Sequence, residues 1–301
     1  MIVRTVKAGV LLCALCVTQV LHLAAPSGAG ETPKCFGERP TIIRRPGQDV
    51  LRGTPGDDVI LVARGRNTRV KGLGGDDRIC DRANLVFVVA GAGDDRISAG
   101  DDNDQIHGGT GNDFIKAGTN GSNGDRASGG RGSDIVDGGP GPNDYVLGRQ
   151  GADTIRGATR AYGGSGNDRI FGAGDTIAVY KEATGGVVVN LTRGTATGQG
   201  SDEFPTGGIT GVIGSPYADK IVGDDADSNF LSGYAGPDLV KGRGGSDEMV
   251  GRSGDDRLEG GTGIDMARGD AGTDECEAEQ QEECEIVLPP ASLVLSPSVL
   301  R

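Results

Sequence analysis

Residues 108–116 read GGTGNDFIK: two glycines, a spacer, a third glycine, and then Asn112, Asp113 and a single aliphatic residue, Ile115, between Phe114 and Lys116. Strings of the same pattern recur along most of the 301-residue chain. With Asp113 taken as position six of nine, acids in phase with it continue in both directions, with small insertions between some repeats. They are Asp49, Asp58, Asp77, Asp95, Asp104, Asp125, Asp134, Asp144, Asp153, Asp168, Asp219, Asp238, Asp247, Asp256, Asp265 and Asp274, with Asn229 in the same phase.

Position eight of the repeat is almost always aliphatic, and its two neighbours are mostly polar. The residues are Leu51, Ile60, Val70, Ile79, Val88, Ile97, Ile106, Ile115, Ala127, Val136, Val146, Ile155, Ile170, Ile221, Leu231, Val240, Met249, Leu258, Ala267 and Cys276. One buried residue between polar neighbours is typical of a three-residue strand whose middle side chain points inward. The preceding glycines favour a tight turn in which φ is positive and backbones approach closely. We therefore expect a coil of short strands in two parallel sheets, with two repeats per turn.

The composition agrees with a repeat architecture. Glycine makes up 56 residues, tryptophan is absent and aromatic residues make up only 4% of the chain, so a conventional mixed core is excluded. A flexible glycine-rich linker would not place an aliphatic residue at every ninth position. The formal charge of −13 argues against a nucleic-acid partner, whose binding proteins carry basic patches. The many carboxylates need counter-charges, which arginine and metal cations can supply.

The N-terminus has the features of a secretory signal at residues 1–29. Arg4 and Lys7 precede an apolar run from Ala8 to Ala25, and Ser27 and Ala29 fit a cleavage site between small residues. The alternative is an uncleaved membrane anchor. We therefore expect a secreted, extracellular protein.

Four cysteines remain in the exported chain, and an even number in this setting suggests two disulfides. Three pairings are possible, and the positions favour Cys35–Cys80 and Cys276–Cys284, near the two ends of the repeats. Zinc is a poor alternative because the exported chain lacks a Cys-x-x-Cys motif and holds one histidine, His107.

The nonapeptides resemble the GGxGxDxUx strings of RTX, or haemolysin-type calcium-binding, repeat proteins. The best matches are residues 108–116, 129–137, 163–171 and 260–268, and the resemblance extends over residues 44–277. It implies a parallel β-roll, a right-handed β-solenoid, with several Ca²⁺ ions between turns, held by position-six aspartates and carbonyls of the glycine turns. The implied ligands are Asp58, Asp77, Asp95, Asp104, Asp113, Asp134, Asp153, Asp168, Asp219, Asp238, Asp247, Asp256, Asp265 and Asp274.

Two repeats per turn place partner aspartates 18 residues apart on one edge of the roll. Asp77–Asp95, Asp95–Asp113, Asp238–Asp256, Asp247–Asp265 and Asp256–Asp274 obey this spacing. Insertions break the 18-residue spacing of other pairs, such as Asp144 with Asp168. Arg131 stands where the partner of Asp113 is due, so we expect Asp113 to be a poor ligand on its C-terminal side. Thr68 and Val86 replace aspartates on the opposite edge, where we expect the Cys35–Cys80 bridge to replace the metal.

The repeats fall into blocks at residues 35–175 and 215–277, followed by a tail at 278–301. Residues 176–214 are expected to form a structured β insertion, in which Ala178–Tyr180 pairs with the strand-like run Val187–Leu191. An enzyme is not expected, because HExxH and a phosphate-binding loop are absent. His107 has no evident catalytic partners, and the paired acids Asp57–Asp58 and Asp255–Asp256 are explained by positions five and six of the repeat.

Together these features predict a secreted calcium-binding β-roll whose folding depends on extracellular Ca²⁺. The alternative is a cell-surface or matrix adhesion protein in which calcium is only structural. A third hypothesis is a hydrolase whose active site lies in the 176–214 insertion, but no nucleophile with an adjacent general base is evident there. Calcium ions are the implied partners; the sequence names neither a polysaccharide or cell-surface partner nor an oligomeric state.

Overall fold

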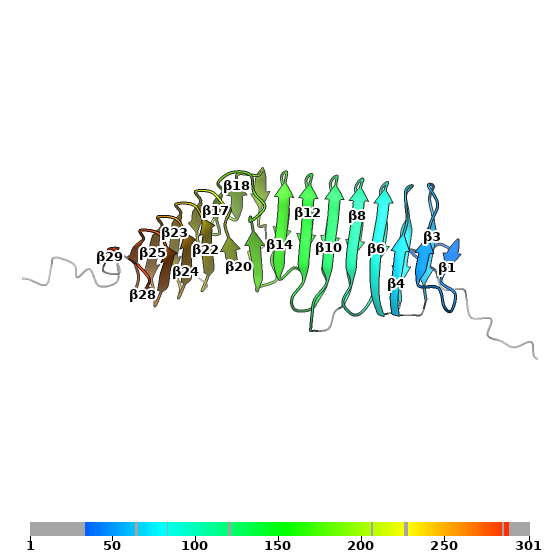
Figure 1. The fold of residues 1–301 in the computed structure, drawn as a ribbon, viewed down its shortest axis with the longest axis horizontal. Helices are drawn as coiled ribbons and strands as arrows, with labels where there is room; N and C mark the ends of the chain where they lie inside the picture. Colours follow the sequence, from blue (N-terminus) through cyan, green and yellow to red (C-terminus); the bar gives the residue numbers. More distant parts are fainter. Residues whose placement is uncertain are drawn as a thin grey trace, which may run out of the picture. The chain divides into compact units, whose positions relative to one another are not determined.

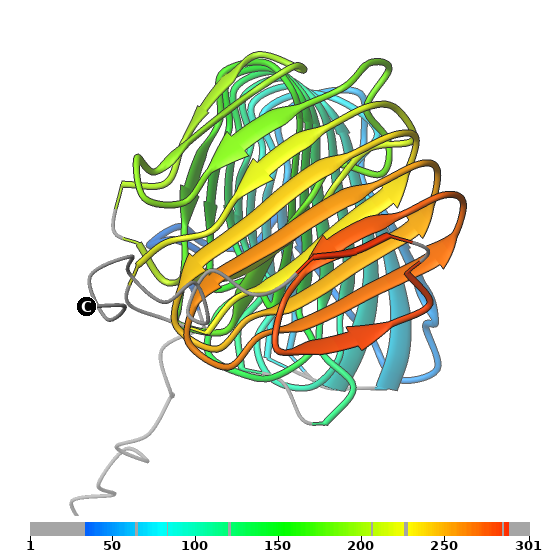
Figure 2. The ribbon, with the colours of Figure 1, turned by 90° about the vertical axis from the view of Figure 1, so that its left-hand side faces the viewer.

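The structure, a computed structural model, describes residues 34–63, 66–82, 84–119, 122–205, 207–225, 228–284 and 286–288. Within these ranges the regular elements are all β-strands, and nearly all consecutive strands lie in opposite sheets. Figure 1 shows the strands of one sheet stacked side by side, and Figure 2 looks along the stack at successive turns. The predicted all-β, parallel β-solenoid is therefore confirmed.

One sheet has 16 strands and the other has 13. In spatial order the first contains β1 (Ile42–Ile43), β3 (Val59–Val62), β5 (Arg78–Asp81), β7 (Arg96–Ser98), β9 (Phe114–Lys116), β11 (Ile135–Asp137), β13 (Thr154–Arg156), β15 (Arg169–Phe171), β19 (Ser201–Glu203), β18 (Thr195–Thr197), β17 (Val188–Asn190), β21 (Lys220–Val222), β23 (Leu239–Gly244), β25 (Arg257–Thr262), β27 (Glu275–Glu277) and β29 (Ile286–Leu288). The second contains β2 (Val50–Arg52), β4 (Arg66–Lys71), β6 (Asn84–Ala92), β8 (Gln105–Thr110), β10 (Arg126–Arg131), β12 (Tyr145–Gln150), β14 (Arg160–Ser165), β16 (Thr176–Val179), β20 (Ile209–Ile213), β22 (Phe230–Ala235), β24 (Glu248–Ser253), β26 (Met266–Ala271) and β28 (Gln280–Glu282).

The core is the thin space between the two sheets. Every residue predicted at position eight is at most 1% exposed, and all of them belong to one continuous cluster. Parallel pairing keeps them in line, so that Ile97, Ile115 and Val136 are direct partners on β7, β9 and β11. The flanking Phe114 is half-buried and Lys116 is exposed, as the repeat pattern predicted.

The substitution Ile115→Ala tests this one-residue core. Ile115 is completely buried, so truncation leaves a cavity that the rigid backbone of the neighbouring turns cannot close. We expect the free energy of unfolding to fall by about 2–5 kcal/mol in a denaturant titration. The exposed neighbour Lys116→Ala is the control and should change it by less than about 0.5 kcal/mol. Equal effects of the two substitutions would contradict the assignment of Ile115 to the core.

Most repeats carry glycine at position four, although Asp102 stands there with φ +79°, and two features favour glycine. Gly111 and Gly132 have φ of +122° and +127°, and a Cβ on Gly132 would lie 2.0 Å from the carbonyl oxygen of Gly111 in the preceding turn. The second position also has positive φ, yet it tolerates a side chain in several turns. Those residues are Leu73, Arg149, Tyr234, Arg243, Arg252 and Asp270.

The segment predicted as an insertion supplies strands to both sheets. β16 lies between β14 and β20 in the 13-stranded sheet, whereas β17 pairs with β18 and β21 in the other sheet. The predicted pairing of Ala178–Tyr180 with Val187–Leu191 is therefore wrong. Ala178 and Val189 enter the same core from opposite sheets, so the two runs face each other rather than share an edge. The antiparallel strands β17, β18 and β19 carry the larger sheet through this region.

Both predicted disulfides, Cys35–Cys80 and Cys276–Cys284, are present. The first ties the N-terminal segment over β3 and β5, where Cys35 and Cys80 form a small second cluster with Val59 and Leu61. This bridge lies on the 16-stranded sheet, so the prediction that it replaces metal beside Thr68 is wrong, because Thr68 belongs to β4 of the other sheet.

The predicted signal at 1–29 lies outside the described residues, as does most of the 278–301 tail beyond residue 288. In the described part of the chain, none of the elements is a helix of the length and apolarity needed to cross a membrane.

Candidate metal centre

The position-six aspartates lie one above another in two ladders, one at the start of the strands of each sheet. In the 16-stranded sheet, the backbone N–H of each aspartate donates to Oδ1 of the aspartate one turn further on. Asp77 donates to Asp95 at 2.8 Å, Asp95 to Asp113 at 2.9 Å, and Asp113 to Asp134 at 2.8 Å. This ladder runs through Asp58, Asp77, Asp95, Asp113, Asp134, Asp153, Asp168 and Asp202, and again through Asp219, Asp238, Asp256 and Asp274.

The second ladder, in the 13-stranded sheet, is interrupted. Its first part links Asp104, Asp125 and Asp144 and ends where the Asp144 N–H donates to Oγ1 of Thr159 at 3.3 Å. Its second part links Asn229, Asp247 and Asp265 and ends where the Asp265 N–H donates to Oε2 of Glu279 at 3.1 Å. Non-aspartate side chains thus terminate the ladder at both places.

In the repeats that begin with glycine, the second carboxylate oxygen, Oδ2, points into a tight cradle at that glycine. A Cβ on Gly108 would lie 2.2 Å from Oδ2 of Asp113 and 2.7 Å from the carbonyl oxygen of Gly129 in the next turn. The same contact of Oδ2 with the first glycine recurs for Asp134 at Gly129 and for Asp256 at Gly251. A carboxylate oxygen and a main-chain carbonyl oxygen therefore converge on one place.

These Oδ2 atoms are buried and accept no hydrogen bond within the described part of the chain. They belong to Asp77, Asp95, Asp113, Asp134, Asp153, Asp168, Asp238, Asp247, Asp256 and Asp265. A buried carboxylate with an unsatisfied oxygen costs several kcal/mol unless a cation or donor reaches it. Calcium takes six to eight hard oxygens, including carboxylates and backbone carbonyls, in flexible geometry. The residues present fit a calcium ion at each such cradle.

Burial raises the pKa of ladder carboxyls such as Asp95, Asp113 and Asp238, and the neighbouring carboxylates add to the effect while the backbone N–H donors oppose it. The pKa of Asp95 and of Asp113 is raised to about 7, and that of Asp238 to about 8. For Asp95, the difference from 3.8 corresponds to about 4 kcal/mol against the ionised form. Without a cation, the ladder at neutral pH is a source of instability.

The raised pKa values predict that acid stabilises the metal-free fold. A carboxyl whose pKa is higher in the folded than in the unfolded state contributes stability below its unfolded value, and this contribution is lost as pH rises through its folded value. In EGTA, β-sheet circular dichroism should therefore increase as the pH falls from 8 towards 5. In calcium the opposite trend is expected, because protons compete for the ligands, so the calcium midpoint should rise as pH falls. A metal-free fold that weakens on mild acidification would contradict these pKa directions.

Three ladder aspartates have Oδ2 already bonded by the protein. Oδ2 of Asp58 accepts from the N–H and Oγ1 of Thr54 at 2.6 and 3.0 Å. Oδ2 of Asp219 accepts from the Ser215 N–H at 2.5 Å. Oδ2 of Asp202 accepts from the hydroxyl of the buried Tyr180 at 3.2 Å. The donor sets at the predicted ligands Asp58 and Asp219 therefore fit calcium less well than those of the other positions.

All five predicted 18-residue pairs are hydrogen-bonded neighbours. The reason for expecting Asp113 to be a poor ligand on its C-terminal side, a displaced Asp134, does not hold, because Asp134 stands in register with it. The three extra residues lie in the connection between β9 and β10 and leave the strand pairing unchanged. Asp144 and Asp168 are not partners at all, since they belong to different ladders.

Sequence reasoning left three ladder aspartates out of the predicted ligands. Asp125 and Asp144 are already in phase with the repeat, so the period itself could have included them. Asp202 has no repeat around it, and only the structure places it beneath Asp168. The paired acids diverge, as the repeat predicted: Asp255 is exposed and accepts from Thr273, whereas Asp256 is buried in the ladder.

Within the described ranges, no group of three or more His, Cys, Asp or Glu side chains gathers in one place. A cation in this part of the protein would therefore depend on one or two carboxylates supplemented by carbonyl oxygens, which favours calcium over zinc. His107 is exposed on the outer face of β8.

A family model described as RTX calcium-binding nonapeptide repeat (4 copies) matches residues 45–68, 87–115, 119–155, 156–176, 224–258 and 250–281. Together these stretches cover more than half of the chain and include all ladder members except Asp77, Asp202 and Asp219. No curated protein matches the chain. The chain therefore belongs to the family of RTX calcium-binding repeat proteins.

Proposed function

We propose that this is a secreted β-roll protein whose folding is driven by extracellular calcium. Ions bind between successive turns, where they are coordinated by Oδ2 of the ladder aspartates and by carbonyl oxygens of the glycine turns. Each ion replaces the repulsion between stacked carboxylates with attraction on both sides. Calcium is thus part of the fold rather than an accessory to it.

The observation that supports this most strongly is the repeated buried Oδ2 without a donor. Two carboxylates ~4 Å apart repel by about 4 kcal/mol at an effective dielectric of 20. The same arrangement recurs from turn to turn, so the costs accumulate along the ladder. The core, one aliphatic side chain per strand, is too thin to offset such accumulated repulsion.

The proposed location outside the cell fits this chemistry. Extracellular calcium modules bind with dissociation constants of roughly 10⁻⁴ to 10⁻³ M, so they fill only where calcium is abundant. The N-terminal segment has the residues of a secretory signal, and the two disulfides are typical of an oxidising compartment. Retention through an uncleaved N-terminal anchor is the alternative, and N-terminal sequencing of the exported protein distinguishes the two.

Circular dichroism and light scattering of the purified protein, with calcium and with EGTA, test calcium-coupled folding. We expect the β signal and the compact radius to be present in millimolar calcium and lost in EGTA. Magnesium at the same concentration is the control, because its smaller ion demands near-ideal octahedral geometry. Identical spectra and radii in calcium and EGTA would exclude the proposal.

Adhesion to a surface or matrix, with calcium only structural, is a second candidate function. It is favoured by a groove of about 740 Å³ on the outer face of the 13-stranded sheet, which the metal ladders do not use. Labelled protein incubated in calcium with the cell wall of its source would be retained if the protein is an adhesin.

A further inference from the structure

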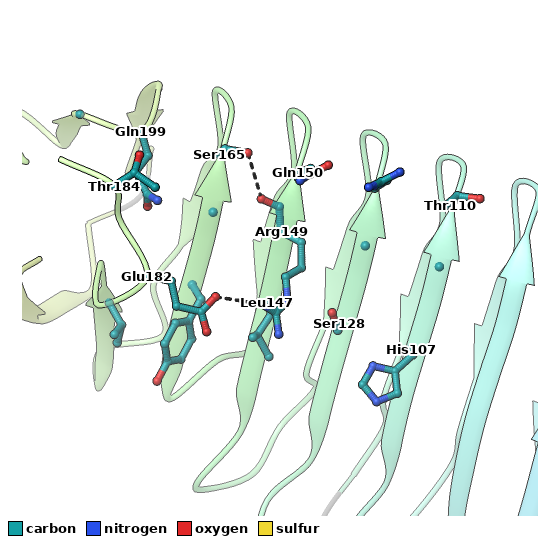
Figure 3. A pocket seen from close by; sticks show the side chains of 17 residues that line it. His107, Thr110, Ser128, Leu147, Arg149, Gln150, Ser165, Glu182, Thr184 and Gln199 are labelled. Atoms are coloured by element: carbon teal, nitrogen blue, oxygen red, sulfur yellow. Dashed lines mark hydrogen bonds and ion pairs between the residues drawn. The ribbon is translucent and has the colours of Figure 1, made fainter. Parts of the chain in front are cut away.

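The groove lies over β8, β10, β12 and β14, on the face that points away from the core (Figure 3). Ser128, Leu147 and Tyr162, at position nine of their repeats, form its floor. One end is open at His107, and the other is closed by Glu182 and Thr184 from the chain after β16. The groove thus runs along the axis of the stack and crosses neighbouring strands spaced ~4.8 Å apart.

The groove is basic in a protein that is acidic overall. The outward side chains of β8, β10, β12 and β14 include no carboxylate; they are Gln105, His107, Arg126, Ser128, Tyr145, Leu147, Arg160 and Tyr162. Arg131 and Arg149 add two charges at the rim. Glu182 is the acid among the lining residues, and it is ion-paired with Arg149 at 2.8 Å.

The same face also offers ring surfaces. Tyr162 stacks with Tyr145 at a centroid distance of 6.5 Å, and the guanidinium of Arg160 lies 5.2 Å from the centre of the Tyr145 ring. The Arg160 Nη1 also donates to the Tyr145 hydroxyl at 2.6 Å, which holds the ring in place. Rigid aromatic rings beside Ser, Thr and Gln side chains suit sugar rings, whose faces are apolar and whose edges carry hydroxyls.

Arg149 occupies a backbone position that favours glycine. Its φ is +93°, and its strand partners on either side, Gly130 and Gly164, are both glycines. Other turns carry different side chains at this position with positive φ, such as Leu73 and Tyr234, so the fold sets no requirement for arginine here. The Arg149 side chain projects over the groove (Figure 3). Arg149 is thus the groove residue whose presence the fold does not require.

We propose that this groove binds an extended acidic polysaccharide, whose carboxylate or sulfate groups pair with Arg131 and Arg149 and whose sugar rings lie on Tyr162. An open groove along the stack fits a chain-like ligand better than a compact one. The net charge of −13 disfavours nucleic acid, which carries one phosphate charge per about 1.7 Å of duplex. A uronate chain carries one charge per sugar, which is a lower charge density than that of duplex DNA.

Arg149→Gly separates binding from folding, because it removes the guanidinium while giving the backbone the residue that its φ prefers. The matched control is Arg252→Gly, at the same repeat position with φ +83°, beside a smaller pocket whose lining includes Arg268 and the acids Glu248, Asp270 and Glu282. Circular dichroism in calcium should be unchanged for both variants. Arg131→Gln provides an independent reduction of groove charge.

The experiment measures binding by calorimetry at one fixed free calcium concentration. The probes are oligosaccharides of equal length that are uronate-bearing, sulfated or neutral. We expect a charged probe to bind the wild type and Arg252→Gly equally, and to bind Arg149→Gly and Arg131→Gln at least tenfold more weakly. Binding should weaken with added salt. The preferred charged probe shows whether carboxylate or sulfate is recognised.

Equal binding of the neutral and charged probes, no binding of either charged probe, or equal losses in Arg149→Gly and Arg252→Gly would each overturn the proposal. A duplex DNA probe that bound in place of the oligosaccharides would also overturn it. Because folding is checked by circular dichroism in the same buffer, failure of the calcium proposal would be seen separately.

Discussion

Replacing Asp256 with asparagine is expected to reduce the number of calcium ions bound at saturation and to raise the calcium midpoint of folding at least tenfold. Asp256 is 2% exposed, accepts the Asp238 N–H on Oδ1 and donates its own N–H to Asp274. Its Oδ2 has no hydrogen-bond donor and lies at the Gly251 cradle. Asparagine keeps the shape of the side chain and one hydrogen-bond acceptor but removes the negative charge, so the cation loses a charged ligand. Tenfold corresponds to about 1.4 kcal/mol.

Asp202→Asn is the matched control. Asp202 also belongs to the ladder and is buried, but Tyr180 already donates to its Oδ2. Its replacement should reduce stability at saturating calcium, because a hydrogen bond to a charged acceptor contributes about 1.5–3 kcal/mol, while the number of bound ions stays the same. The number of calcium ions bound per protein, measured by equilibrium dialysis, distinguishes the effects of Asp256→Asn and Asp202→Asn. Equal counts for the wild type and Asp256→Asn would refute the assignment of Asp256 as a ligand.

The second large effect is expected for Gly263→Ala, at position four of the repeat. Gly263 has φ +137°, and a Cβ there would lie 1.5 Å from the carbonyl oxygen of Gly245 in the preceding turn. The backbone conformation costs about 1–3 kcal/mol for alanine, and the overlap adds about 1–3 kcal/mol more. The turns must therefore separate, which also pulls carbonyl oxygens out of line. Guanidinium unfolding in saturating calcium should show a loss of roughly 3–5 kcal/mol by these same terms.

Gly261→Ala, two residues earlier in the same turn, controls for the loss of a glycine as such. It occupies position two, where Tyr234, Arg252 and Asp270 stack in successive turns with side chains in place. A Cβ there would lie 2.2 Å from the carbonyl oxygen of Arg243, but the side chains present at this position in other turns show that the backbone can accommodate one. The cost of Gly261→Ala should therefore be smaller, about 1–2 kcal/mol. If Gly261→Ala proved as damaging as Gly263→Ala, the special role of position four would be disproved.

Most of the fold could be predicted from the nine-residue period. The inward residue at position eight, the two strands per turn and the 18-residue partners follow from geometry that each repeat obeys independently. Ile115 illustrates this: one aliphatic residue between Phe114 and Lys116 already defines which side faces the core. The disulfide pairing could be predicted for the same reason, because the two cysteine pairs lie near the two ends of a regular stack of turns.

The errors arose where the chain departs from the period. Counting residues placed Arg131 beneath Asp113, but the strand register is fixed by the inward side chains, because a one-residue slip would expose Val136. Extra residues therefore bulge into a turn and leave Asp134 in place. Asp202 and its partner Tyr180 were not predictable, since their contact depends on how β16 and β19 face each other across two sheets.

Anomalous X-ray diffraction from crystals grown with calcium tests the central claim most directly, because it locates each ion. Peaks are predicted beside Oδ2 of Asp113, Asp134, Asp153, Asp247 and Asp256, each between a carboxylate and a carbonyl oxygen of a glycine turn. No peak is predicted at Oδ2 of Asp58, Asp202 or Asp219, which the protein itself already bonds. Ions confined to exposed surface acids such as Asp94 and Asp255, with both ladders empty, would contradict the account.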